Sequence, residues 1–178
     1  MISIIAPPSN ESPMALLLAC HDRIRQNLKV CWKLAEADEQ DVDAIRNSAR
    51  NAATYLTQAL PLHMEDERDS VMPRLLGQSD RLDRALICME REHQSEVSRV
   101  QDLLRLLLRL AQDPKSLSVI RSELSFTVRH LTVSLESHLT REEKEIFPLL
   151  AALDQEEQDT IVFEMRRRRN PDYAVTDL

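Results

Sequence analysis

Apolar residues recur every three or four positions through four long segments of the chain, which is the period of an α-helix with one buried face. The first segment spans residues 13–37, and Ser12-Pro13 before it combines a capping hydroxyl with a proline at the first helical position. Its predicted buried stripe is Leu17, Ile24, Leu28, Cys31 and Leu34. The pattern therefore predicts an amphipathic helix in this segment.

The second segment, residues 42–71, follows a polar turn at 38–41. Its predicted inward residues are Ile45, Ala49, Ala52, Leu56 and Leu60. Pro61 lies inside this helix and is expected to bend or loosen it. Pro73 and Gly77 are expected to end it.

Two more long helices and a short one follow. The third helix begins at Ser79 or Asp80 and runs to about 111, with Leu86, Met89, Val97, Val100, Leu104 and Leu108 predicted to face inward. Glu92 and Glu96 are assigned to its solvated face. After a turn at Asp113-Pro114 the fourth helix covers 117–150. Asp154 and Glu157 have the spacing of a capping box that opens a short fifth helix over 154–168.

Long helices joined by short turns favour an all-α, antiparallel, up-down-up-down four-helix bundle with a short C-terminal fifth helix. The composition agrees, because the chain has a single glycine and only 3% aromatic residues, too few for a sheet protein with many turns. We expect a flexible N-terminus at 1–12, one bundle domain at 13–168 and a flexible tail at 169–178.

Charge and cysteine usage restrict the function classes. The net charge of −7 argues against a nucleic-acid partner, and the one basic run, Arg166 to Arg169, is interpreted as the solvated end of a helix. No stretch is apolar enough to cross a membrane, and residues 1–12 have no basic start typical of a signal peptide. Three cysteines without a CxxC spacing indicate neither a disulfide framework nor a thiolate zinc site, so a cytoplasmic location is expected.

The ends of the second and fourth helices repeat each other. The stretch HMEDERDSVMPRLL from His63 aligns without gaps on HLTREEKEIFPLLA from His138. The matched pairs are His63 and His138, Glu67 and Glu142, Val71 and Ile146, Met72 and Phe147, Pro73 and Pro148, and Leu75 and Leu150. This order suggests a bundle with pseudo-two-fold symmetry whose repeated residues face one another.

Histidine and glutamate four residues apart lie on one helix face, and this donor pair suits Fe, Mn or Zn better than Ca or Mg. In an up-down bundle His21 and His93, near the starts of the first and third helices, come to the level of His63 and His138. Their neighbours are mostly apolar, so the imidazoles and carboxylates are expected to be buried, which is costly without partners. Metal coordination removes that cost, and each carboxylate could bridge two ions.

A histidine on the first helix, HxxxE on the second, a histidine on the third and HxxxE before Phe-Pro on the fourth resemble the hemerythrin-like (HHE cation-binding) family over almost the whole chain. The resemblance implies a centre of two iron ions, oxo- or hydroxo-bridged when oxidised, with Mn or Zn as substitutes. It implies terminal histidine ligands and two bridging carboxylates, namely His21, His63, His93, His138, Glu67 and Glu142.

Two positions depart from the oxygen carriers of that family. The carriers have a second histidine one turn after the ligand on the third helix, where this chain has Val97, which argues against reversible oxygen carriage. The carriers' longer spacing on the fourth helix would select Glu143, whereas the internal repeat selects Glu142. The ferritin-like di-iron arrangement is disfavoured because its ExxH motif occurs once, at Glu90 and His93.

These observations predict a cytoplasmic di-iron binding protein that senses or responds to O2, NO, peroxide or iron, with metal ions and a small diatomic or peroxide ligand as its partners. The first alternative is an oxidoreductase, a peroxidase or NO-reducing enzyme using the same centre; whether the chain is an enzyme stays open. The second is a metal-free helical interaction protein, a homodimer formed through the first or the fifth helix.

Overall fold

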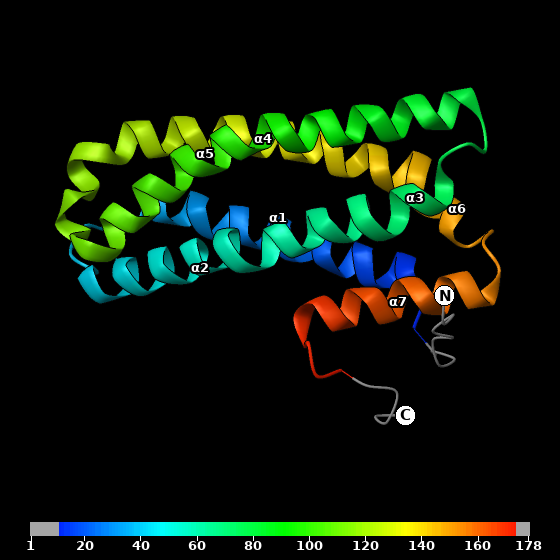
Figure 1. The fold of residues 1–178 in the computed structure, drawn as a ribbon. Coiled ribbons are helices and arrows are strands. Elements are labelled where there is room, and N and C mark those ends of the chain that lie inside the picture. Colours follow the sequence, from blue (N-terminus) through cyan, green and yellow to red (C-terminus); the bar gives the residue numbers. More distant parts are fainter. Residues whose placement is uncertain (1–10, 174–178) are drawn as a thin grey trace. The chain divides into compact units, whose positions relative to one another are not determined.

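The computed structural model describes residues 11–173, which contain helices and no strand, so the predicted all-α fold class is confirmed (Figure 1). The expected flexible ends, 1–12 and 169–178, lie largely outside the described residues. The long helices are α1 (Pro13–Glu36), α2 (Val42–Asp66), α4 (Asp80–Gln112), α5 (Leu117–Arg141) and α7 (Gln155–Arg169). The short elements are η1 (Glu67–Val71), α3 (Met72–Leu75), η2 (Pro114–Ser116), η3 (Glu142–Ile146) and α6 (Phe147–Leu150).

The chain divides into two compact units. The first unit consists of the chain up to His21, residues 62–90 and the chain from Thr140 onward. The second unit consists of residues 22–61 and 91–139. Each is described by itself below.

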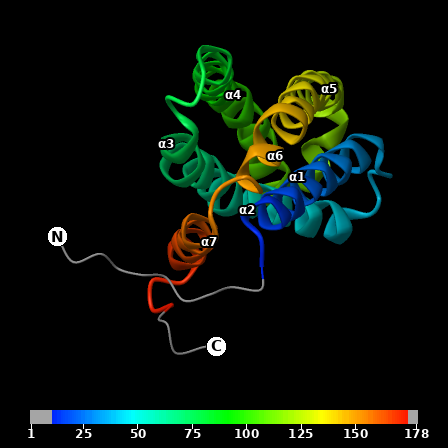
Figure 2. The same ribbon diagram turned by 90° about the vertical axis from the view of Figure 1, so that its right-hand side faces the viewer.

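The second unit is a bundle of four helical segments, one each from α1, α2, α4 and α5 (Figures 1 and 2). Its interior holds the predicted stripe of the first helix from Ile24 onward and the whole predicted stripe of the second, together with leucines of α4 and α5. Arg121 of α5 donates hydrogen bonds to the carbonyl oxygens of Ala35 and Ala37 at 2.5 and 3.1 Å. These bonds satisfy carbonyls that the end of α1 leaves without helical partners, and they join α5 to α1.

The first unit has its own apolar core, to which α7 contributes. Ile161 and Met165 of α7 pack in one cluster with Leu17 of α1 and with Phe147, which is fully buried. Asp154 precedes α7, and its carboxylate accepts a hydrogen bond from the backbone N–H of Glu157 at 2.9 Å. The predicted cap of the fifth helix is thus present.

Both copies of the internal repeat contain a π-helical turn that begins at the glutamate of the HxxxE motif. η1 begins at Glu67 and η3 at Glu142, and the α-helical turn after each carries Pro73 or Pro148 near its start. A wider turn accommodates a proline, which lacks an N–H and would otherwise clash with the preceding turn. Pro73 therefore does not end the second helix as expected.

The helical path instead continues to Leu75, and Gly77 follows with a φ of 86°, a left-handed conformation that suits glycine. Pro61 lies inside α2, which runs unbroken from Val42 to Asp66. The helix is therefore not broken at Pro61, and the expected bend or loosening there stays a prediction.

The predicted inward face of the third helix was partly wrong. Val97 and Leu108 are 46% and 47% exposed, whereas Glu96, assigned to the solvated face, is 4% exposed. Glu96 accepts hydrogen bonds from the Ser134 hydroxyl and from Arg99, which offset the cost of burying its carboxylate. The buried stripe runs through His93 and Glu96. Because the prediction considered apolar residues alone, it assigned the buried face of this helix to the wrong side at Glu96 and Val97.

The basic run is not simply a solvated helix end. Arg166 pairs with Glu11, while Arg168 and Arg169 both bind the carboxylate of Asp66, which is fully buried. The end of α7 is thus joined by ion pairs to other parts of the first unit. Within the described residues, no helix has the length and apolar character to cross a membrane.

Candidate metal centre

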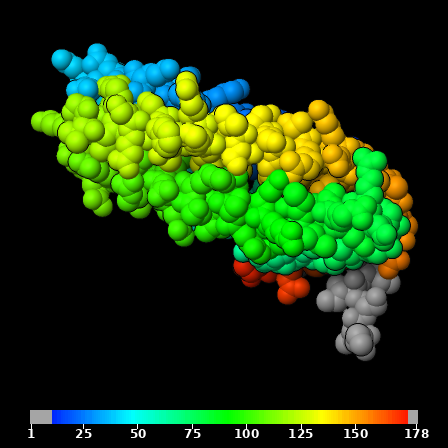
Figure 3. All heavy atoms as spheres, turned by 90° about the horizontal axis from the view of Figure 1, so that it is seen from above, coloured from blue at the N-terminus to red at the C-terminus, as the bar shows by residue number. Residues whose placement is uncertain are grey.

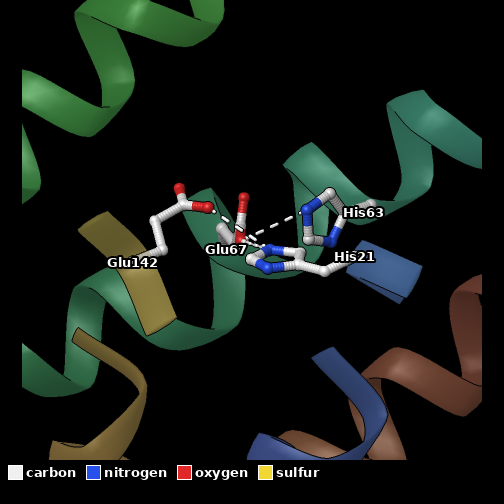
Figure 4. A group of neighbouring side chains, drawn as sticks. All are labelled: His21, His63, Glu67 and Glu142. Carbon is white, nitrogen blue, oxygen red and sulfur yellow. Dashed lines mark ion pairs between the residues drawn. The ribbon is translucent and has the colours of Figure 1, made fainter. Parts of the chain in front are cut away.

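Four of the six predicted ligands come together in the first unit. His21 lies on α1, His63 on α2, Glu67 at the start of η1 and Glu142 at the start of η3 (Figure 4). Their exposed fractions are 0%, 2%, 0% and 1%. One ligand atom from each of the four lies within 4.8 Å of the ligand atoms of the other three. The group is therefore compact and shielded from water.

The spacing of these donor atoms matches that of ligands around one metal ion. His21 Nε2 lies 3.3 Å from Glu142 Oε2 and 3.7 Å from Glu67 Oε1. His63 Nε2 lies 3.3 Å from the same Glu67 oxygen. Metal–ligand bonds of about 2.0–2.2 Å would put neighbouring ligands of one ion about 3–3.5 Å apart. Two imidazoles and two carboxylates are also a donor set that binds Fe, Mn or Zn.

A third carboxylate, that of Glu143, lies at the Nδ1 side of the His21 ring. Glu143 Oε1 lies 2.8 Å from His21 Nδ1, within hydrogen-bond distance. Such a bond fixes the tautomer and the orientation of a metal-binding imidazole, because the proton sits on Nδ1 and Nε2 keeps its lone pair. Glu142 thus faces Nε2 of His21, and Glu143 faces Nδ1.

The carboxylates make the group electrostatically negative around His21. Burial alone would lower the pKa of His21, but hydrogen bonding and Coulombic attraction from Glu142 and Glu67 outweigh it and raise the pKa to about 9. A cation at this position is therefore strongly favoured. In the metal-free protein the proton on His21 supplies the positive charge. A metal ion would neutralise the same carboxylates with more than one positive charge.

Aromatic packing fixes the position of the His21 ring. Its centroid lies 4.8 Å from that of Phe147 and 5.0 Å from that of His63, the latter in an edge-on arrangement. Phe147 belongs to the Phe-Pro pair of the second repeat copy. The repeat thus supplies Glu142 and also a ring that restrains the opposing histidine.

The other two predicted ligands lie in the second unit. His93 on α4 and His138 on α5 are 5% and 3% exposed, and their ring centroids are 4.7 Å apart. His138 Nδ1 lies 2.8 Å from Glu92 Oε2, the same kind of carboxylate–imidazole bond that Glu143 makes with His21. His130, the remaining histidine, is exposed.

Sequence reasoning missed three acidic residues here. Glu92 was placed on the solvated face but contacts His138, and Glu96 is buried. Asp66 precedes Glu67 and is held by arginines of α7 more than 100 positions later in the chain. Separations of this size leave no local pattern, so only the packed structure identifies these partners.

Comparison with known proteins agrees with the ligand pattern. A family model described as the hemerythrin HHE cation binding domain matches residues 12–150, a range that includes all six predicted ligands and ends before α7. No curated protein and no solved structure matches the chain. A match over this much of the chain, together with the buried His/Glu group in an all-α fold, shows that the protein belongs to the hemerythrin HHE cation-binding family.

Proposed function

We propose that this chain is a non-haem di-iron protein of the cytoplasm that senses or responds to O2, NO, peroxide or iron. The proposed ligands are His21, His63, His93 and His138, with Glu67 and Glu142 as bridging carboxylates. The observation that carries the proposal is the buried group of two imidazoles and two carboxylates in the first unit, whose donor atoms have the spacing of metal ligands.

In each unit one histidine has a carboxylate at its Nδ1 that orients the ring for metal binding. Glu143 holds the Nδ1 side of His21, and Glu92 holds the Nδ1 side of His138. Each bond raises the basicity of its ring and directs Nε2 away from the carboxylate partner. When bound, iron would supply redox chemistry and a coordination position for a small ligand.

A sensing role is favoured over oxygen carriage. The position one turn after His93 holds Val97, whose side chain is 46% exposed, so this chain provides no second imidazole there. A site with fewer protein ligands leaves room for exchange of a small molecule. Fe over Mn or Zn is the proposed occupancy because the resemblance to the family implies it, and each of these metals accepts this donor set.

The test is metal analysis combined with optical spectra. Protein purified without a histidine tag or chelator would be loaded with Fe(II) under argon and then exposed to air. We expect about two iron ions per chain and a new absorption band in air. A His63→Ala, His138→Ala double variant should lose the iron, whereas His130→Ala, which alters an exposed histidine, should keep it. Wild-type protein that holds no iron would overturn the proposal.

An oxidoreductase using the same centre is the second candidate. A pocket of about 510 Å³ in the second unit is lined by His138 and Glu92 and has polar walls that include Ser95 and Ser134. Such a pocket could admit peroxide or NO towards the His138 side of the site. Catalytic consumption of H2O2 or NO by the iron-loaded protein would favour the enzyme, and oxidation that stops after one equivalent would favour the sensor.

A further inference from the structure

An arginine at the end of α7 contacts the residues that directly precede two of the proposed metal ligands. Arg169 Nη2 lies 2.6 Å from Asp66 Oδ2 and 3.8 Å from Cys20 Sγ. Asp66 precedes Glu67, and Cys20 precedes His21. Successive residues of a helix point about 100° apart, which lets Asp66 and Cys20 contact Arg169 while the ligands beside them face the metal group. One guanidinium group therefore joins α7 to both α1 and α2 next to their ligands.

The π-helical turn η1, which begins with a proposed ligand, is held from α7 at a second place. Arg168 donates hydrogen bonds to Asp66 Oδ1 and to the Ser70 hydroxyl, both at 2.8 Å. Arg74 donates to the backbone carbonyl of Ser70 at 2.7 Å and pairs with Glu164 of α7 at 2.9 Å. Asp66 and Ser70 are both fully buried. The residue before the ligand and the residue three positions after it are thus both fixed from α7.

The apolar face of α7 packs against the residues that position His21. Ile161 and Met165 belong to the cluster that contains Leu17, which lies one turn before His21 on α1, and Phe147. The ring of Phe147 lies 4.8 Å from the ring of His21. α7 therefore supports the surroundings of one ligand by apolar packing and those of another by ion pairs.

Helix α7 is also the one long helix that the family match leaves out, because the matched residues are 12–150. Figure 3 shows part of α7 (orange-red) at the molecular surface, and residues on its outer side such as Glu156 and Arg167 are exposed. Since α7 is the last helix and one of its faces is exposed, its docking can change while the helices that carry the ligands keep their fold.

We propose that Arg168 and Arg169 are positioning residues for the metal centre, and that docking of α7 and metal binding stabilise each other. By fixing Asp66 the arginines hold Glu67 in place before a metal ion arrives, which lowers the ordering cost of binding. If docked α7 raises the metal affinity, bound metal must stabilise docked α7 by the same factor. Metal binding at His21 and Glu67 is taken from the proposed function, on which this inference rests.

The first test measures the dissociation constant for Zn²⁺ and, under argon, for Fe(II), by competition with a chromophoric chelator. The Arg168→Gln, Arg169→Gln double variant should bind about 10-fold more weakly, as expected when residues that orient metal ligands are lost. Arg167→Gln is the matched control, because Arg167 lies between the two and is exposed, and it should bind as the wild type does.

A loss of metal affinity must be separated from a mere loss of stability. Ile45→Ala removes buried apolar surface in the second unit, so it should lower Tm but leave the dissociation constant unchanged. Circular dichroism should show that the variants keep their helices. If the double variant did not, Arg169→Gln alone is the milder substitution, and it should still weaken binding.

A mutant cycle tests whether the arginines act through Asp66. Asp66→Asn should also weaken Zn²⁺ binding about 10-fold. Adding the Arg168→Gln, Arg169→Gln pair to Asp66→Asn should weaken binding no further, because the ion pairs are already broken. Losses that simply add would overturn the proposal.

Hydrogen exchange of residues 155–169 tests the reverse effect. Saturating Zn²⁺ should slow amide exchange in α7 of the wild type about 10-fold, and it should not do so in the double arginine variant. A wild type that binds neither metal would overturn this inference together with the proposed function. A wild type that binds metal without slower exchange in α7, or a double arginine variant that binds as tightly as the wild type, would overturn this inference alone.

Discussion

Asp66 is the buried acid on which the end of α7 depends, and its removal should destabilise the first unit. The side chain has no exposed surface, and its two oxygens accept hydrogen bonds from Arg168 Nη1 at 2.8 Å and Arg169 Nη2 at 2.6 Å. Arg168 also donates to the Ser70 hydroxyl at 2.8 Å. Asp66→Asn would keep the shape of the side chain but remove the charge and half of its acceptors.

The magnitude follows from the exposure of the partners. Breaking a fully buried ion pair by removing one partner costs about 3–5 kcal/mol. Here the arginine side chains are 20% and 29% exposed, so they can recover some hydration, and we expect about 2–3 kcal/mol. For a chain of this length that corresponds to a fall in Tm of about 4–12 °C.

Thermal and urea unfolding of the metal-free protein would measure the effect. Asp69→Asn is the matched control, because Asp69 pairs with Arg68 at 2.8 Å but both side chains are nearly half exposed. Such a surface pair contributes about 0–1 kcal/mol. If Asp66→Asn proved no more destabilising than Asp69→Asn, the buried ion pairs of Asp66 would not contribute to the free energy of unfolding as expected.

Four further predictions concern the metal group and the thiols. Added Fe(II) should stabilise the wild type by about 2.7 kcal/mol at one hundred times Kd, and a His63→Ala variant that gains as much would contradict the site. Glu142→Gln should lower metal content more than Glu143→Gln, for which about 10–100-fold weaker binding is expected, and equal losses would argue against Glu142 as the ligand. The raised pKa of His21 stabilises the metal-free protein fully below pH 6.5, and this contribution should fade as the pH rises through about 9, so a flat urea-unfolding profile over that window would refute it. A thiol reagent should modify one cysteine rapidly in the native protein, Cys88, and Cys88→Ser should abolish that reaction, since Cys88 alone of the three is exposed.

The fold class and the positions of the helices were predictable because both depend on short-range patterns. The predicted first helix, 13–37, and the observed α1, Pro13–Glu36, differ by one residue, and the cap at Asp154 is present as expected. A capping side chain, a proline at the first position and a helical period act over a few neighbouring residues. They need no knowledge of what the helix will contact.

The candidate ligands could also be named from the sequence, since the HxxxE spacing places both side chains on one helix face. Its second occurrence, within an aligned repeat, distinguished it from a single HxxxE that arises by chance. His21 and His93 carried no motif of their own, and their selection depended on the expected bundle and on the resemblance to the family. Only the structure shows that Glu142, and not Glu143, faces Nε2 of His21.

Tertiary structure alone decided which polar residues are buried and what they bind. Glu96 and Asp66 look like surface acids in the sequence, yet both lie in the interior, where the Ser134 hydroxyl of α5 donates a hydrogen bond to Glu96 and arginines of α7 pair with Asp66. Those partners are separated from them by 38 to 103 positions. Local patterns determine whether a segment is helical, whereas burial of a charge depends on the groups that packing brings to it, and no short-range pattern records those groups.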